Sequence, residues 1–346
     1  VLDPRDAPKP LTLARLTEVL AQRIPLVPVL RRKLLNVPLG LDQPYWIDDP
    51  DFDIEYHVRE IALPRPGSDA QLNEQVSRLH ARPLDRSKPL WEIYLITGLA
   101  KRRAAVSTKI HHAAIDGVSG TELLTVLLDL DPSGRELPAS VPFRPAPPPP
   151  LPAIAAKAVA RLAWRPVQTA QMTNEVIRWL PTLAPVMSTL VGGMLGLNRG
   201  DGEVSPTTPG RPPATPFNRP ITPHRRFAFR SVDLDTVKAE KNAFGVSVND
   251  VVMAMCAGAL RRWLIDHDAL PDQPLVAMIP VSVRDPASQG ALGNKVSAML
   301  APLPTSVTDP GLRLEIVHSA TKIAKAQQAA IPQGLVDQIS DFAPPA

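Results

Sequence analysis

The sequence has 346 residues, more than one compact core usually holds, so we expect two domains or one large one. Apolar residues make up 44% of the chain, and its one cysteine, Cys256, excludes an internal disulfide framework and a cysteine-rich metal site. The formal net charge of +4 falls short of the dense basic surface of a nucleic-acid-binding protein. Anionic small molecules and anionic membrane surfaces remain compatible partners.

The first part of the chain alternates the residue patterns of helices and strands. Apolar residues recur at helical spacing in some segments and at every second position in others. The predicted elements are a helix over 13–24, a half-exposed strand over 52–58, a helix opened by a Ser68–Gln71 capping box, strands over 91–96 and 104–110, and a helix opened by a Ser119–Glu122 capping box.

Prolines gather in the middle of the chain. Of the 41 prolines, 19 lie between Pro132 and Pro223, including the run at 147–150. Such segments disfavour regular structure and are typical of stiff linkers. Residues 179–198 contain no charged side chain, which leaves three interpretations open: a membrane span, an interfacial or substrate-facing helix, or a helix buried between two halves. Prolines, glycines and hydroxyls in this stretch disfavour the span.

The last part of the chain alternates helix and strand patterns as the first part does. Its predicted elements are a strand over 226–232, a helix over 233–244 that Gly245 terminates, a long helix capped by Ser247, strands over 275–283 and 296–303, and an amphipathic helix over 312–323. The pattern predicts an α/β architecture in two halves, 1–131 and 224–346, joined by a proline-rich linker and helical segment at 132–223. A cleft between the halves is the expected place for a ligand.

The local sequence with the most chemical content is His111-His112-Ala113-Ala114-Ile115-Asp116-Gly117, which follows a predicted strand. If the strand continues, His112 shares the apolar face with Ile110, and His111 points away. Imidazole suits general-base catalysis because its ordinary pKa lies near neutral pH. Asp116 is placed to pair with an arginine, and Gly117 permits a backbone turn. The alternative is a pair of core or surface histidines beside a turn aspartate.

These residues resemble the HHxxxDG motif of the bacterial wax ester synthase/diacylglycerol acyltransferase family. The motif is shared with the wider superfamily that includes chloramphenicol acetyltransferase, carnitine acyltransferases and peptide-synthetase condensation domains. Three further segments resemble this family in particular, in the same order along the chain: the element over 83–91 that ends in Pro89-Leu90-Trp91, the segment with Asn249-Asp250, and the segment with Gly293-Asn294.

The resemblance implies two chloramphenicol-acetyltransferase-like halves with mixed sheets and a channel between them. It implies that acyl-CoA is a co-substrate, that no metal or other cofactor is needed, and that diacylglycerol or a long-chain alcohol accepts the acyl group. The second motif histidine, here His112, would act as the general base, and Asp116 would pair with an arginine, for which Arg284 is the candidate. The enzyme would work in the cytoplasm, peripherally bound to the inner face of the membrane or to lipid droplets, without contacting nucleic acid.

Each implied residue also has a purely structural interpretation. Trp91 suits core packing, Asn249 and Asp250 suit helix capping, and Arg284 suits a surface turn before Pro286. The five other histidines are placed on polar faces or loops without a role. Relatives usually continue past the position of Ala346, so we expect the second half to be incomplete.

Two other functions stay open at this point. One is a condensation-type acyltransferase that uses carrier-protein thioesters, and the other is a non-catalytic lipid-binding relative. The preferred acceptor, the acyl chain length and the oligomeric state are not predicted by the residues.

Overall fold

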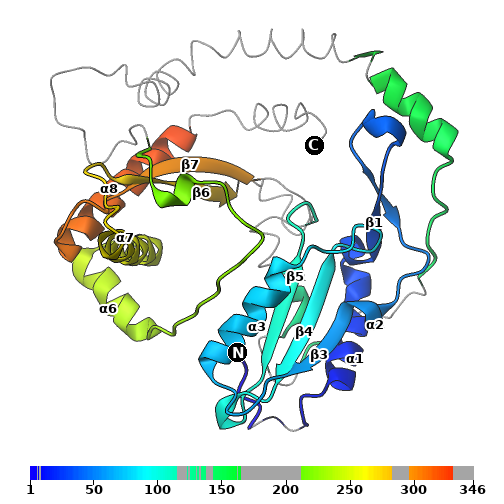
Figure 1. The fold of residues 1–346 in the computed structure, drawn as a ribbon, viewed down its shortest axis with the longest axis horizontal. Helices are drawn as coiled ribbons and strands as arrows, with labels where there is room; N and C mark the ends of the chain where they lie inside the picture. The colour runs from blue at the N-terminus through cyan, green and yellow to red at the C-terminus, as the bar shows by residue number, and fades with distance from the viewer. Residues whose placement is uncertain are drawn as a thin grey trace.

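The computed structural model describes residues 1–5, 7, 9–114, 123, 125–129, 131, 134–137, 143–161, 163–164, 212–282 and 296–329. Within these residues the helices and strands form two lobes (Figure 1). The N-terminal lobe holds α1 (Leu13–Arg23), β1 (Arg32–Leu35), β2 (Tyr45–Asp48), α2 (Ile54–His57), β3 (Val58–Ala62), α3 (Asp69–Ala81), β4 (Trp91–Thr97) and β5 (Ala105–Ile110). The C-terminal lobe holds α6 (Leu234–Phe244), α7 (Val248–Asp266), β6 (Leu275–Ser282), β7 (Val296–Leu303) and α8 (Pro310–Ala329). Short 3-10 helices occupy Ile24–Leu26, Pro28–Arg31, Pro38–Gly40, Ala100–Arg102 and Pro216–Asn218.

The N-terminal lobe is built around a three-stranded mixed sheet in the order β3-β4-β5. Strand β4 runs parallel to β3 and antiparallel to β5. It is covered on both faces, because alternate side chains of a strand point to opposite sides. Ile93 and Leu95 pack in the cluster on the α1 side, whereas Tyr94 and Ile96 pack in the cluster under α3. This burial on both faces explains the apolar run from Ile93 to Ile96 at the centre of the strand.

The C-terminal lobe packs α7 and α8 against a two-stranded antiparallel sheet, and α6 packs against α7. Strands β6 and β7 pair from Leu275 opposite Leu303 to Ser282 opposite Val296. Helix α7 buries Ala257 and Leu264 against both strands, and α8 buries Ala324 against β7. Most helix stability in such a lobe comes from this packing rather than from intrinsic propensity.

The helix starts predicted at Ser68 and Ser247 and the helix end predicted at Gly245 are confirmed. The Ser68 and Gln71 side chains each accept a hydrogen bond from the other residue's backbone N–H, at 3.3 and 2.8 Å. Ser247 caps α7 in the same way with Asp250 as the third helical residue. Gly245 ends α6 in the left-handed conformation with φ +64°, which glycine adopts without a steric penalty. The Ser119–Glu122 box lies outside the described residues.

Two strand predictions are wrong. Residues 52–58 contain the short helix α2 instead of a strand, because the Asp53 side chain accepts a hydrogen bond from the Glu55 N–H at 2.9 Å and caps a helical turn. Strand β3 begins only at Val58. Residues 226–232 are extended but join no strand ladder among the described residues.

An extended segment, residues 212–232, connects the two lobes, and we call it the strap. At its start Phe217 packs on Trp263 of α7, with ring centroids 4.8 Å apart. Further along, Phe229 packs against the apolar cluster beneath α3 of the N-terminal lobe. The strap then returns to α6, as the yellow-green trace in Figure 1 shows. The strap therefore contacts both α7 of the C-terminal lobe and the cluster beneath α3 of the N-terminal lobe.

Part of the predicted linker is ordered against the N-terminal lobe. Helical residues 151–161 bury Ile154 and Ala158 against Val37, beside the β1–β2 hairpin, and Arg161 pairs with Asp42 at 3.2 Å. Residues 179–198 lie outside the described part of the chain. The proposed domain limits at 131 and 223 stay a prediction.

Candidate functional site

The two motif histidines follow directly from the edge strand of the N-terminal sheet. Strand β5 ends at Ile110, and His112 begins a turn in which Ala114 donates a backbone hydrogen bond to the His111 carbonyl oxygen at 2.9 Å. Both histidine side chains are exposed. The strand does not continue to His112, so the condition for placing this side chain on the apolar face is not met.

The turn also selects the tautomer of a neutral His111 ring. The backbone N–H of Ala113 donates to Nδ1 of His111 at 3.1 Å. Because Nδ1 must accept this bond, a neutral His111 ring carries its proton on Nε2. His111 therefore helps to hold the backbone that carries His112.

The Pro89-Leu90-Trp91 element lies directly beside the histidine motif. The His111 N–H donates to the carbonyl oxygen of Leu90 at 2.9 Å, and Trp91 pairs with Ile110 in the β4–β5 register. Pro89 and Leu90 are buried. Two motifs separated by about twenty residues of sequence are thus adjacent rungs of one antiparallel ladder.

The Trp91 side chain forms a buried support beneath these rungs. The indole N–H of Trp91 donates to the Leu30 carbonyl oxygen at 2.7 Å. The backbone carbonyl oxygen of Trp91 accepts a hydrogen bond from Nδ1 of His57 at 2.7 Å. The His57 ring stacks on Trp91 at 4.4 Å and on Phe52 at 5.5 Å. Trp91 therefore packs in the core, in accordance with its structural interpretation.

His57 is buried, although the residue pattern predicts a polar face or loop without a role for it. Its side chain is 1% exposed. Burial lowers the pKa of His57, and the hydrogen bond to Trp91 and the charge of Glu92 oppose this shift. The neutral imidazole thus serves as an aromatic packing residue. No local pattern marked it, because its partner lies 34 residues along the chain.

The other face of β5 is tied to helix α3. The ammonium group of Lys109 donates to the carbonyl oxygens of Leu79, at 3.0 Å, and Arg82. Burial lowers the pKa of Lys109, while Glu92 on the neighbouring strand opposes that effect. These contacts satisfy carbonyl groups at the end of α3, which have no partner within the helix. The histidine turn is consequently held from both faces of the sheet.

In the C-terminal lobe, Asp250 is the centre of a buried polar network. Its carboxylate accepts hydrogen bonds from the Ser247 N–H at 2.9 Å, the Ser247 hydroxyl at 2.8 Å and the Thr321 hydroxyl at 2.7 Å. Nδ1 of His318 lies 3.0 Å from the same carboxylate. Asp250 is 2% exposed, whereas Asn249 is exposed. Asp250 therefore takes part in the cap of α7, as its structural interpretation predicts, and the network also joins α7 to α8.

The network determines the ionisation of Asp250. Burial alone would raise its pKa, but hydrogen bonds from His318, Ser247 and Thr321 outweigh this effect and bring the pKa to about 2. His318, placed on a polar face without a role by sequence, proves to be a partner of this carboxylate. The contact was not visible locally, because the two residues are 68 positions apart.

Five predicted site residues lie outside the described part of the chain: Asp116, Gly117, Arg284, Gly293 and Asn294. The predicted pair between Asp116 and Arg284 therefore stays a prediction. Within the described residues, no three His, Cys, Asp or Glu side chains are grouped to hold a metal ion. No single described helix is long and apolar enough to cross a membrane, and α6 with α7 meets that test only as a pair bent by 103°.

Two family models match this chain. The catalytic domain of the wax ester synthase/diacylglycerol acyltransferase family matches residues 1–252, which include both histidines and the Asp250 network's helix start. The C-terminal domain of the same family matches residues 292–346. The chain belongs to this family.

Relatives and solved structures agree with this membership. A Mycobacterium tuberculosis (strain CDC 1551 / Oshkosh) protein, provisionally named a diacylglycerol O-acyltransferase, is 37% identical over 343 residues, covering 99% of the chain and 65% of the relative. The wax ester synthase/diacylglycerol acyltransferase of Marinobacter aquaeolei VT8 superposes with a TM-score of 0.61 at 29% identity, covering 97% of this chain and 67% of that one. The chain thus spans about two thirds of the length of these proteins.

The fold prediction is confirmed by the same comparisons. The first condensation domain of the calcium-dependent antibiotic synthetase matches with a TM-score of 0.52 at 19% identity, over 92% of this chain and 68% of that one, which shows the shared fold alone. This member of the wax ester synthase/diacylglycerol acyltransferase family is a mixed α/β protein with two chloramphenicol-acetyltransferase-like lobes.

Proposed function

We propose that this protein transfers a long-chain acyl group from acyl-CoA to the hydroxyl of diacylglycerol, and also to long-chain alcohols. The observation that carries the proposal is the backbone pairing of His111 with Leu90, which joins the HHxxxDG motif to the Pro89-Leu90-Trp91 element at the end of β5. Family membership and the name of the mycobacterial relative support the same reaction.

In the proposed mechanism His112 acts as the general base. Its imidazole takes the proton of the acceptor hydroxyl as that oxygen attacks the thioester carbonyl carbon. A new C–O ester bond forms, the C–S bond breaks, and the CoA thiolate takes the proton back from the imidazolium. The reaction balances without a metal, another cofactor or a covalent acyl-enzyme. The exposed position of His112 after the strand leaves it accessible to both substrates.

The remaining motif residues hold this group in place. His111 braces the turn through its contact with the Ala113 N–H, and Trp91 supports the rung beneath it. We assign Asp116 and Gly117 to the shape of the same loop, with Arg284 as the partner of Asp116. Asn249, Gly293 and Asn294 belong to the wall of the substrate channel in this proposal.

We also propose that the protein works in the cytoplasm, attached peripherally to the inner membrane face or to lipid droplets, where diacylglycerol resides. The uncharged stretch 179–198 and the basic residues Arg161, Arg165 and Arg178 would provide the attachment. Liposome flotation tests it: deletion of 179–198 should reduce binding. Unchanged binding would show that this stretch is not the attachment site.

The reaction is tested by measuring CoA release from palmitoyl-CoA with diacylglycerol and with hexadecanol as rival acceptors. We expect thiol release that depends on an acceptor and an ester product visible by mass spectrometry. Palmitoyl-carrier protein should not replace palmitoyl-CoA. Exclusive use of the carrier thioester would favour a condensation-type enzyme, and lipid binding without CoA release would favour a non-catalytic relative.

A further inference from the structure

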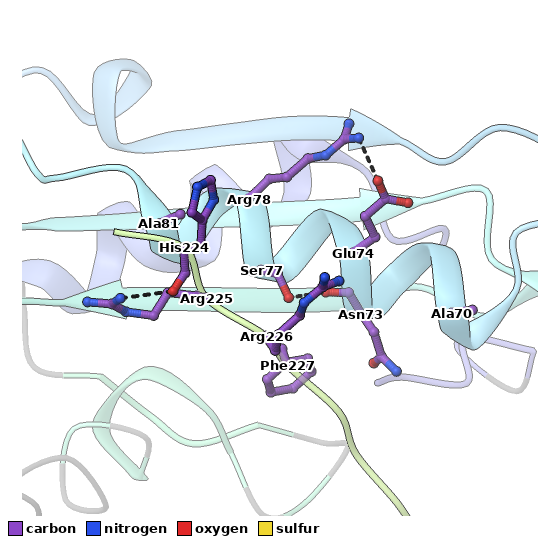
Figure 2. A pocket seen from close by; sticks show the side chains of 10 residues that line it. All are labelled: Ala70, Asn73, Glu74, Ser77, Arg78, Ala81, His224, Arg225, Arg226 and Phe227. Atoms are coloured by element: carbon purple, nitrogen blue, oxygen red, sulfur yellow. Dashed lines mark hydrogen bonds and ion pairs between the residues drawn. The ribbon is translucent and has the colours of Figure 1, made fainter. Parts of the chain in front are cut away.

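A polar groove lies between helix α3 and the strap, apart from the residues assigned above. Its volume is about 550 Å³. Side chains from α3 form one wall and residues 224–227 of the strap form the other, as Figure 2 shows. The lining residues are Ala70, Asn73, Glu74, Ser77, Arg78, Ala81, His224, Arg225, Arg226 and Phe227.

The charge of the groove is positive and only partly compensated. Arg78 pairs with the single acidic side chain of the lining, Glu74, at 2.5 Å. Arg225 donates to the backbone carbonyl oxygens of Thr222 and His224, which leaves its charge without a carboxylate. Arg226 makes no ion pair or hydrogen bond among the described residues and lies beside Asn73 and Ser77 in Figure 2. The whole strap contains no aspartate or glutamate.

The strap also presents an exposed aromatic ring next to these arginines. Phe227 is 44% exposed, whereas Phe229, whose ring centroid lies 6.2 Å away, is packed into the cluster beneath α3. The partly buried Phe229 therefore anchors the strap, while Phe227 stays open to a ligand. Arginine forks bind phosphate oxygens, and an aromatic face stacks on a nucleobase, so the two features together fit a phosphorylated nucleotide.

One end of the groove is linked to strand β5 through the side chain of Lys109. Ala81, which lines the groove, stands between the carbonyl groups of Leu79 and Arg82, and both accept hydrogen bonds from Lys109. Lys109 precedes His111 by two residues on β5. A nucleotide bound along α3 would thus lie on the face of the sheet to which the Lys109 side chain points, two residues before the histidine turn.

We propose that the groove between α3 and the strap binds the adenosine phosphate end of CoA, with Arg226 contacting phosphate and Phe227 facing the base. The inference rests on the proposed acyl-CoA reaction for the identity of the ligand. The thioester arm then leaves the groove at its Ala81 end, toward the turn that carries His112. CoA carries phosphates, which suit the positive charge of the arginines, and an adenine, which suits the exposed ring of Phe227.

The test compares CoA binding by calorimetry to the whole chain and to three exposed-site variants. Arg226→Ala should weaken CoA binding roughly tenfold, as expected for loss of a charge-assisted hydrogen bond. Glu74→Gln should tighten binding about twofold to threefold, because it frees Arg78 and removes the repelling charge. Arg230→Ala makes the same charge change on the strap outside the groove lining and should leave affinity within about twofold.

The ligand itself provides a second comparison. Dephospho-CoA, which lacks the 3′-phosphate, should bind the unaltered chain several-fold more weakly than CoA, and inorganic phosphate should compete with both. Vesicles of phosphatidic acid distinguish a lipid headgroup from a nucleotide. Binding of these vesicles that depends on Arg226 and that CoA does not displace would overturn the proposal.

Equal losses for Arg226→Ala and Arg230→Ala would also overturn it, since the effect would then be general electrostatics. So would a Glu74→Gln variant that binds CoA no more tightly. The groove and the reaction fail separately. An unchanged KM for acyl-CoA in Arg226→Ala rejects the groove and leaves the enzyme, whereas Arg226-dependent CoA binding without acyl transfer rejects the enzyme and leaves the groove.

Discussion

Trp91 in the N-terminal lobe and Asp250 in the C-terminal lobe are both motif residues, and both are almost fully buried. Trp91 is neutral and is held by ring stacking with His57 and one hydrogen bond to Leu30. Asp250 is charged and is held by hydrogen bonds from three side chains and a backbone N–H. One motif position is secured by apolar contact and the other by electrostatics.

Motif residues thus fall into two groups: buried residues that support the fold, which we call frame residues, and exposed residues that can meet substrates. Trp91 and Asp250 each join chain segments that are distant in sequence, and neither reaches solvent. His111 and His112 lie on a turn supported by the first of these frames, and their side chains are exposed. Replacing a frame residue should therefore change stability, whereas replacing His112 should change turnover.

The largest stability effect is expected at Asp250. Asp250→Ala leaves the buried Thr321 hydroxyl and the half-buried Ser247 donors without their acceptor, which should lower the free energy of unfolding by about 3 kcal/mol. Urea unfolding followed by circular dichroism measures this change. Asp235→Ala, on the exposed first turn of α6, is the matched control and should stay within about 0.5 kcal/mol. Similar losses in both variants would contradict the network.

Trp91→Phe should have the next largest effect. Phenylalanine keeps an aromatic ring over His57 but removes the indole N–H that pairs with the buried Leu30 carbonyl, so we expect a loss of about 2 kcal/mol. CoA release measured well below the unfolding transition should stay within about tenfold of the unaltered chain, because Trp91 does not reach the turn surface. A loss of turnover as large as that of His112→Ala would make Trp91 part of the reaction.

The two helix caps offer a smaller, paired comparison. Ser68→Ala and Ser247→Ala each remove an N-cap hydroxyl, which costs about 1 kcal/mol. Ser247→Ala should be the more destabilising of the two, since its hydroxyl also donates to the buried Asp250 carboxylate. Urea unfolding of the two variants side by side gives the order, and a reversed order would show that the network does not depend on this donor.

The smallest effects are two separate pH windows. Burial lowers the pKa of His57 below its unfolded value of about 6.5, so the unfolded chain binds more protons and stability falls as the pH drops below that value. Asp250, with a folded pKa of about 2, contributes stability above about pH 3.8 that is lost as the pH falls toward 2. Unfolding measured from pH 8 to pH 5 should be flatter for His57→Phe than for the unaltered chain, with His80, also lowered by burial, retaining part of the slope. An equal slope would contradict the first window.

Local rules predicted much of this fold. The capping boxes at Ser68 and Ser247, the stop at Gly245 and the strands β4 to β7 each depend on residues within a few positions of one another. The strand at 52–58 was predicted from alternation that is real in exposure, yet one side-chain cap at Asp53 turns the backbone into α2.

Long-range contacts limit how much of the candidate site can be predicted from the sequence. His57 and His318 gain their roles from Trp91 and Asp250, which lie 34 and 68 residues away, so no local pattern reveals them. Residues 226–232 of the strap resemble a strand by composition but have no partner to pair with among the described strands. The closeness of the two N-terminal motifs likewise appears only in the β4–β5 register.

The role of His112 is tested most directly by comparing CoA release by the unaltered chain, His112→Ala and His267→Ala. His267 is an exposed histidine at the end of α7 and controls for loss of an imidazole far from the turn. We predict that His112→Ala lowers turnover roughly a hundredfold or more with an unchanged unfolding midpoint, while His267→Ala stays near the unaltered rate. Near-normal turnover in a folded His112→Ala protein would contradict the proposed general base.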